Sequence, residues 1–127
     1  MFKFLYKKPK PSKSKYEFKM LYDFETRKKE SDIILLNNPD KIPVIIEKSD
    51  SSNIQDLNTH IWIINKNITI SQLMQSVRAH LKLDTSQCIF FFINNSYIAS
   101  TKETLDQVYK NHSHETKDGW LYITYSG

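Results

Sequence analysis

Glycine is scarce in this chain: only Gly119 and Gly127 occur among its 127 residues. Two glycines cannot form the glycine-rich loop that binds phosphate in nucleotide-binding proteins, so that class of site is excluded. The single cysteine, Cys88, excludes an internal disulfide bond, which favours a reducing compartment. No apolar run approaches the roughly 20 residues of a membrane-spanning helix, and the N-terminus lacks the apolar core of a signal peptide. These absences favour a globular protein of the cytoplasm.

Residue groups with catalytic or metal-binding potential are also sparse. Cys88 belongs to the apolar run 88–93 and has no basic neighbour in sequence, so we expect a buried, unreactive thiol. His112 and His114 stand in a polar segment without a cysteine pair or a set of carboxylates at the spacing of a zinc site. His60 is expected on the surface of a strand. We therefore predict that the protein is not an enzyme and holds no metal ion or cofactor.

Positive charge is concentrated at the N-terminus. Residues 1–15 hold six lysines and no acidic residue, whereas the other 112 residues carry 12 basic and 14 acidic groups, a net charge of −2. This predicts a basic flexible arm, 1–15, before a single folded domain, 16–127. The arm is either a solvated tail or a contact to an anionic membrane. A near-neutral body argues against nucleic-acid binding.

Periodicity and capping residues predict an alternation of helices and strands. Helices are expected over 16–22, over 24–36 with Asp23 as its N-cap, over 70–81 after the capping box 69–72, and through 105–109 after the capping box 100–103. Strands are expected over 41–47, 60–64, 88–93 and 120–127. Ile33 and Ile34 are expected to face a core, and the run 88–93 to be covered on both faces. Pro43 predicts that its strand lies at an edge or is unpaired at that end.

This order predicts an α+β fold, the ubiquitin-like β-grasp with two additional N-terminal helices. The last strand then lies inside the sheet beside the first, and its end projects from one edge of the fold. That strand finishes at Gly127, an uncommon residue here. A carboxylate on a residue without a side chain suits passage into a narrow active site, as in a modifier joined through its tail. The alternative is a chain that simply stops there.

Four segments, taken together and in this order, resemble the autophagy ubiquitin-like modifiers, the family of the microtubule-associated light chains and the GABA-receptor-associated protein. They are residues 24–31, 41–48, 92–95 and 118–126, within a match that spans roughly 18–127. The resemblance implies conjugation through the C-terminal glycine to phosphatidylethanolamine by activating and conjugating enzymes. It also implies a monomer that is cytoplasmic, and on the autophagosome membrane when lipidated.

The resemblance further implies a groove for cargo receptors that carry an aromatic-x-x-aliphatic motif. Main-chain bonding to a sheet edge would supply affinity, and two pockets would read the side chains. The aromatic pocket carries over to Glu30, Ile34, Pro43, Ile61, Ile63 and Trp120, with Lys41 in the same groove; the aliphatic pocket carries over to Trp62, Ile64, Ile68 and Leu73. Composition alone favours plain core packing for the aliphatic set, whereas the resemblance favours the groove for the strand 60–64.

This chain departs from the family pattern at three groove positions. Thr59 and Ile61 stand where two lysines are usual, and His80 where an arginine is usual. Exposed ion pairs are worth about 0.2–1 kcal/mol each, so losing three would weaken an acidic peptide by roughly one to two orders of magnitude. We therefore predict a groove that is more apolar and less sensitive to salt than is typical of the family.

The C-terminal end departs from the pattern as well. The family's tail usually continues several residues beyond the match to Gly127, and five extended residues would add about 17 Å of reach. Either the natural chain is short and needs no trimming, or a tail has been removed. Two other functions also remain open: a non-conjugated interaction module that uses the same groove, and a modifier conjugated to a protein.

Overall fold

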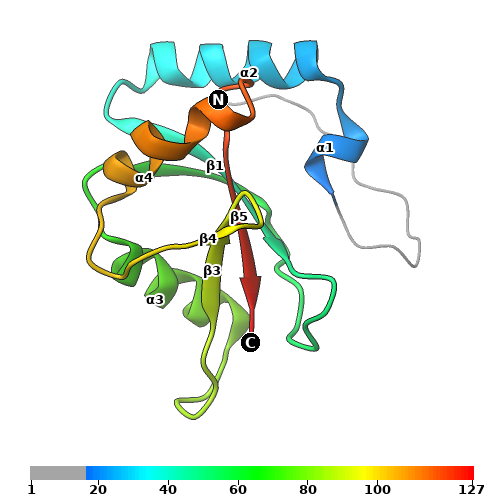
Figure 1. The fold of residues 1–127 in the computed structure, drawn as a ribbon, viewed down its shortest axis with the longest axis vertical. Coiled ribbons are helices and arrows are strands. Elements are labelled where there is room, and N and C mark those ends of the chain that lie inside the picture. The colour runs from blue at the N-terminus through cyan, green and yellow to red at the C-terminus, as the bar shows by residue number, and fades with distance from the viewer. Residues whose placement is uncertain (1–16) are drawn as a thin grey trace.

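The structure is a computed structural model that describes residues 17–127 (Figure 1). The predicted arm 1–15 and residue 16 of the predicted first helix lie outside the described residues. The elements are α1 (Phe18–Leu21), α2 (Phe24–Asn37), β1 (Lys41–Lys48), β2 (Ile61–Asn65), α3 (Ile70–Leu81), β3 (Phe90–Ile93), β4 (Tyr97–Ile98), α4 (Leu105–His112), the 3₁₀ turn η1 (Ser113–Glu115) and β5 (Leu121–Ser126).

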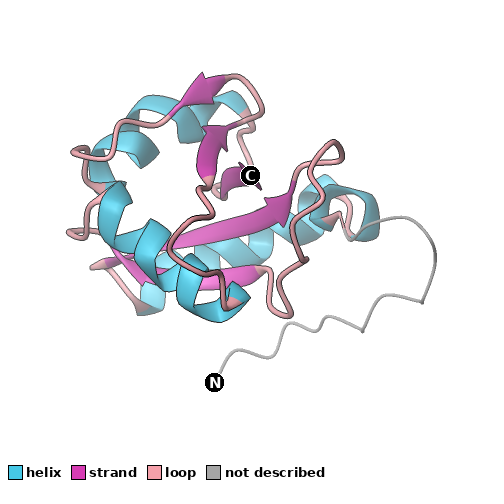
Figure 2. Cartoon of the chain, turned by 90° about the horizontal axis from the view of Figure 1, so that it is seen from below, coloured by secondary structure: helices cyan, strands magenta, loops and turns pink. Residues whose placement is uncertain are grey.

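The five strands form one mixed sheet in the order β2-β1-β5-β3-β4. The last strand, β5, is central: it pairs parallel with β1 and antiparallel with β3. Helices α1 and α2 precede the sheet in sequence, and α3 connects its two halves, as Figures 1 and 2 show. This is the predicted ubiquitin-like α+β fold with two additional N-terminal helices, and the central position of β5 beside β1 is confirmed.

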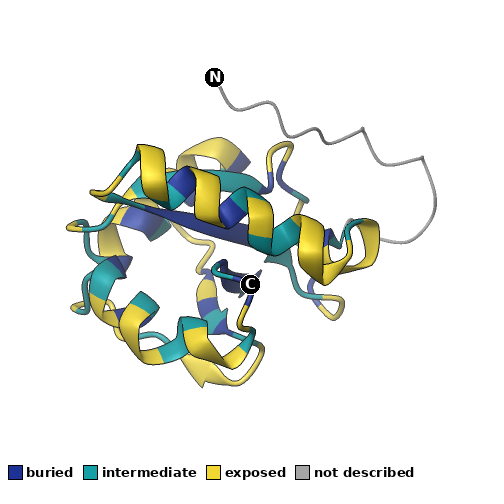
Figure 3. Cartoon of the chain, turned by 90° about the horizontal axis from the view of Figure 1, so that it is seen from above, coloured by how far each residue is buried: buried dark blue, intermediate teal, exposed yellow. Residues whose placement is uncertain are grey.

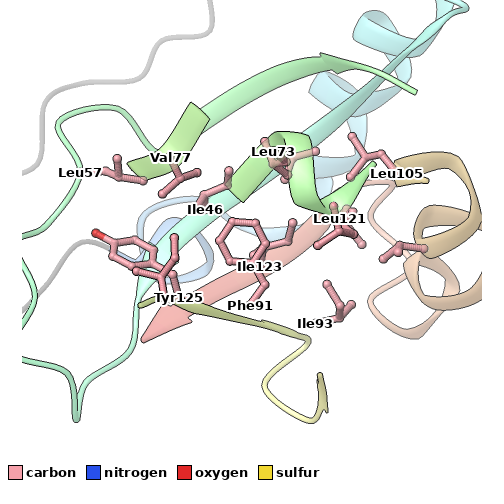
Figure 4. Close-up of a cluster of buried hydrophobic side chains, with 14 of the residues drawn as sticks. Ile46, Leu57, Leu73, Val77, Phe91, Ile93, Leu105, Leu121, Ile123 and Tyr125 are labelled. Carbon is pink, nitrogen blue, oxygen red and sulfur yellow. The ribbon is translucent and has the colours of Figure 1, made fainter. Parts of the chain in front are cut away.

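Both faces of β1 and β5 are covered by helices. Successive strand side chains point to opposite faces. Val44, Ile46 and Ile123 therefore join the larger core, which α3 and α4 close (Figure 4), whereas Ile45 and Tyr122 join a smaller core beneath α1 and α2. We call these two sides of the sheet the α3 face and the α2 face. Double coverage explains why β1 and β5 are almost continuously apolar.

The same double coverage was predicted for the run 88–93, and this prediction is wrong. The strand begins only at Phe90, whose side chain is 53% exposed, and Cys88 is exposed as well. Helices α1 and α2 pack over β1 and β5 and leave the outer face of β3 open. The burial expected for the Cys88 thiol is therefore absent.

Local signals at the helix ends were mostly correct. The Asp23 carboxylate accepts a hydrogen bond from the Thr26 amide (2.9 Å), and the Thr69 capping box is formed. The box predicted at 100–103 does not begin a helix: α4 begins at Leu105 and is capped by Thr104. Helix α1 is shorter than predicted.

The second helix buries only one of its two adjacent isoleucines. Ile34 is buried, but Ile33 is 42% exposed, so its predicted core position is wrong. Figure 3 shows buried and exposed residues alternating along α2, with the exposed ones on its outer side. Adjacent residues are about 100° apart on a helix, so a sheet on one side of α2 cannot bury both equally.

Candidate functional site

The edge strand β2 exposes part of its backbone. In an antiparallel pair, hydrogen-bonded and non-hydrogen-bonded residues alternate. The His60 carbonyl accepts from the Ile46 amide (2.9 Å), and the Lys66 amide donates to the Asp40 carbonyl (3.0 Å). Even-numbered positions from 60 to 66 therefore direct their backbone groups toward β1. The odd-numbered positions 61 and 63 direct their amides and carbonyls away from the sheet.

This alternation explains why β1 tolerates Pro43. Pro43 lies opposite Ile63 in a non-hydrogen-bonded pair, so its missing N–H is not needed by β2. On the other side of β1, pairing with β5 begins only at Val44, opposite Leu121. β1 is therefore not an edge strand, and the second predicted alternative, an unpaired end, holds only on the side of β5.

The predicted aromatic-pocket residues gather on the α2 face. Ile61 and Ile63 of β2 are half-buried and pack against the small core that contains Ile34 and Trp120. Trp120 is fully buried, and its indole N–H donates to the Arg27 carbonyl (2.8 Å). Glu30, one helical turn before Ile34, is half-exposed, and Pro43 is buried. Lys41 is half-buried at the start of β1, opposite Asn65 at the end of β2.

The predicted aliphatic-pocket residues gather on the α3 face. Trp62, Ile64 and Ile68 are half-buried against the larger core, to which Leu73 belongs. Leu73 is only 1% exposed, so it backs this surface from within. The structure thus brings together each predicted set, and places the two sets on opposite faces of β2.

The three positions that depart from the family pattern lie beside this surface. The Trp62 indole N–H donates to the Thr59 carbonyl (3.0 Å), and the His80 ring meets the Trp62 ring edge-on at 4.9 Å. The ring nitrogen Nδ1 of His80 lies 2.8 Å from the Ser76 carbonyl. From Ile61 to Asn65 the strand carries no charged side chain. Glu30 and Lys41 are the charged members of the predicted groove.

A buried carboxylate that sequence reasoning missed joins α2 to β5. Asp118 is fully buried, and its carboxylate accepts from Arg27 Nε (2.8 Å), the Tyr122 hydroxyl (2.6 Å) and the Trp120 amide (3.0 Å). Its backbone carbonyl accepts from the Ser31 hydroxyl (2.6 Å). Burial, and then the hydrogen bond to Asp118, raise the pKa of Tyr122 well above its ordinary value.

The close approach of α2 to this turn also accounts for Gly119. Its φ of +85° lies in the region that favours glycine, and a Cβ there would overlap the Ser31 side chain. The sequence pattern Asp-Gly indicated only the turn. The role of Asp118 as the centre of a network depends on residues 87 and 91 positions away, so no local signal could have revealed it.

Gly127 follows β5 at the end of that strand away from Trp120. Its amide donates to the Ser52 hydroxyl (3.3 Å), and the space that a Cβ would need is occupied by the Ile54 side chain. Gly127 therefore lies against the loop between β1 and β2.

Within residues 17–127, no three His, Cys, Asp or Glu side chains are grouped as metal ligands would be. None of the described helices is long and apolar enough to cross a bilayer.

Comparison with known proteins places this chain in one family. Residues 26–127 match the family model described as "Autophagy protein Atg8 ubiquitin like". Autophagy-related protein 8e of Arabidopsis thaliana is 38% identical over 110 residues, covering 87% of this chain and 88% of the relative. Autophagy-related protein 8 of Candida glabrata is 36% identical over 113 residues, covering 89% and 93%.

The solved structures agree. The crystal structure of Trypanosoma brucei ATG8 superposes with a TM-score of 0.80 at 26% sequence identity, covering 93% of this chain and 96% of that one. The chain belongs to the Atg8 family of ubiquitin-like autophagy proteins.

Proposed function

We propose that this protein is a ubiquitin-like modifier that is joined to phosphatidylethanolamine and recruits cargo receptors through the edge of β2. Its family membership supports the autophagy role. In this role the protein supplies a carboxylate and a docking surface and is not itself a catalyst. It is a monomer in the cytoplasm and reaches the autophagosome membrane when lipidated.

The observation that supports a peptide groove is that the aromatic-pocket and aliphatic-pocket residues lie on opposite faces of the open edge strand β2. Residues three apart in an extended peptide point to opposite sides. A peptide that adds to β2 as a further strand would bond to the outward amides and carbonyls of Ile61 and Ile63. It would then direct an aromatic residue to the α2 face and an aliphatic residue three positions on to the α3 face.

The lack of charge along β2 favours a partner peptide that binds through its main chain and apolar side chains. Because β2 itself carries no lysine, it attracts acidic flanking residues less strongly, so main-chain bonding and apolar anchors supply most of the affinity. Trp120 and Leu73 are already buried, so a peptide would contact chiefly the half-buried side chains above them. Small outward movements of α2 would deepen the aromatic side.

The conjugation step follows from the chemistry of a terminal carboxylate. An activating enzyme joins the Gly127 carboxylate to AMP and releases pyrophosphate from ATP. An enzyme cysteine thiolate then displaces AMP and forms a thioester, and the amine of phosphatidylethanolamine attacks it, releasing the thiol and forming an amide. Glycine has no side chain to obstruct entry of the carboxylate into the active sites of these enzymes.

Mass spectrometry of the full chain from cells under autophagy induction tests the proposal. A phosphatidylethanolamine adduct on Gly127, absent from a Gly127→Ala variant, is the expected result. A carboxylate that stays unmodified would favour the non-conjugated interaction module. A larger species that resists phospholipase would instead indicate conjugation to a protein.

A further inference from the structure

The loop between β1 and β2 is bonded to the last residues of β5 at three points. The Ser49 amide donates to the Tyr125 carbonyl (2.8 Å), the Tyr125 hydroxyl to the Gln55 carbonyl (3.0 Å), and the Gly127 amide to the Ser52 hydroxyl (3.3 Å). The first two bonds attach the loop to the body of the strand. The third bond holds Gly127 itself.

The part of the loop that touches Gly127 is the 49–54 segment. Ser52 is only 7% exposed, and its hydroxyl also accepts from the Ile54 amide (3.1 Å). The Lys48 ammonium group donates to the Ser52 carbonyl (2.9 Å) and holds the segment toward β1. The Ile54 side chain fills the space beside the Gly127 Cα, so the glycine is held by its amide and by packing.

The loop beyond this segment is anchored separately. Leu57 is 5% exposed and packs in the larger core near Tyr125 (Figure 4). The Asp56 carboxylate accepts from the Leu57 amide (3.0 Å) and lies 3.2 Å from His60 Nε2. Burial opposes ionisation of Asp56, but the interactions with His60, the Leu57 amide and the Lys48 charge together hold its pKa below the ordinary value. Release of Gly127 by Ser52 and Ile54 would therefore leave the contacts of residues 56–60 intact.

We propose that the 49–54 segment retains Gly127 against the fold and must release it before the carboxylate can enter an activating enzyme. Ser52 and Ile54 are then positioning residues that set the rate of conjugation. This inference rests on the proposed function. A strand end that is hydrogen-bonded and packed is not available to extend into a narrow active site. The reactive population is the fraction in which the Ser52 bond and the Ile54 contact are both broken.

Removing the Ser52 hydroxyl should enlarge that fraction. One neutral hydrogen bond typically corresponds to about a fivefold factor in such an equilibrium. Ser52→Ala is therefore expected to accelerate thioester formation by about fivefold, and the Ser52→Thr variant, which keeps a hydroxyl, should restore the slower rate. Ile54→Ala, which removes the packing contact with Gly127, should accelerate it as well. Asn53→Ala is the matched control, because Asn53 is an exposed neighbour in the same segment.

The test uses the full chain, ATP and a limiting amount of an activating enzyme from an Atg8 system, with thioester formation followed on non-reducing gels. Exchange of the Gly127 amide, followed by NMR, reports release independently. Faster exchange together with faster thioester formation in Ser52→Ala and Ile54→Ala supports the inference. Faster exchange with an unchanged or slower thioester rate overturns it. Failure of the unmodified chain to form any thioester refutes the proposed function, and this inference with it.

Discussion

Replacing Asp118 by alanine is expected to destabilise the domain more than any surface substitution. The carboxylate is fully buried, and the Arg27 side chain that it pairs with is only 13% exposed. The substitution leaves this guanidinium without its partner and removes the acceptor of the Tyr122 hydroxyl. Breaking a buried ion pair by removing one member costs about 3–5 kcal/mol.

Urea denaturation, followed by tryptophan fluorescence, measures this loss. With an m-value of about 2 kcal/mol/M, the midpoint of Asp118→Ala should fall by about 1.5–2.5 M while m stays the same. Asp118→Asn should lose less, because an amide oxygen can still accept from the Trp120 amide. Asp32→Ala is the control: its bond to Lys28 joins two exposed side chains one helical turn apart, and such pairs contribute about 0.3–0.5 kcal/mol.

The same substitution should also affect the groove. Asp118 fixes α2 against the start of β5; α2 supplies Ile34 to the aromatic side, and Trp120 directly precedes β5. Folded Asp118→Asn should therefore bind an aromatic-x-x-aliphatic peptide more weakly than the unmodified chain. A midpoint for Asp118→Ala within about 0.3 M of that of the unmodified chain would refute this reasoning. It would show that removing the carboxylate leaves no costly unpaired group in the buried network.

Three further predictions concern pH, the strand edge and salt. Because the pKa of Tyr122 is raised in the fold, the contribution of Tyr122 to stability is complete below the ordinary tyrosine pKa of about 10 and is lost as pH rises above that value. Urea denaturation measured between pH 8 and 11 should show this decline. The decline should be smaller in Tyr122→Phe. Ile63→Pro removes an outward amide without breaking a hydrogen bond to β1, so it should weaken peptide binding about tenfold with little loss of stability. Ile64→Pro should instead unfold the β2 edge. Equal destabilisation by both variants would contradict the deduced alternation of hydrogen bonds. Peptide affinity should change less than about threefold between 50 and 500 mM salt, since β2 carries no charge; a steep fall would disprove the prediction of an apolar groove.

Most of the order of helices and strands was predicted from sequence alone, because its signals are local, but the two-residue strand β4 was missed. The N-caps at Asp23 and Thr69 act on amides three residues away, and the apolar periodicity of 70–81 needs no partner to be recognised. Together with the family resemblance, these signals predicted the fold and the residues of the candidate groove.

The exposure of individual residues was decided only by tertiary structure. The run 88–93 is as apolar as β1, yet Phe90 and Cys88 are exposed because none of the helices within residues 17–127 packs over that side of β3. Pro43 left two alternatives open, and the pairing of β1 with both β2 and β5 resolved them. Sequence patterns do not specify which side of a strand its neighbours cover.

The contacts that organise the two functional regions were also decided by tertiary structure. Asp118 gathers Arg27 and Tyr122, and Ser52 meets Gly127 from 75 positions away. Such pairs depend on loop paths and sheet order, which a local pattern does not contain. The sequence therefore determined the main helices and strands and the family they build, whereas the packing of α2 and of the 49–54 segment on β5 determined how the candidate groove and Gly127 are held.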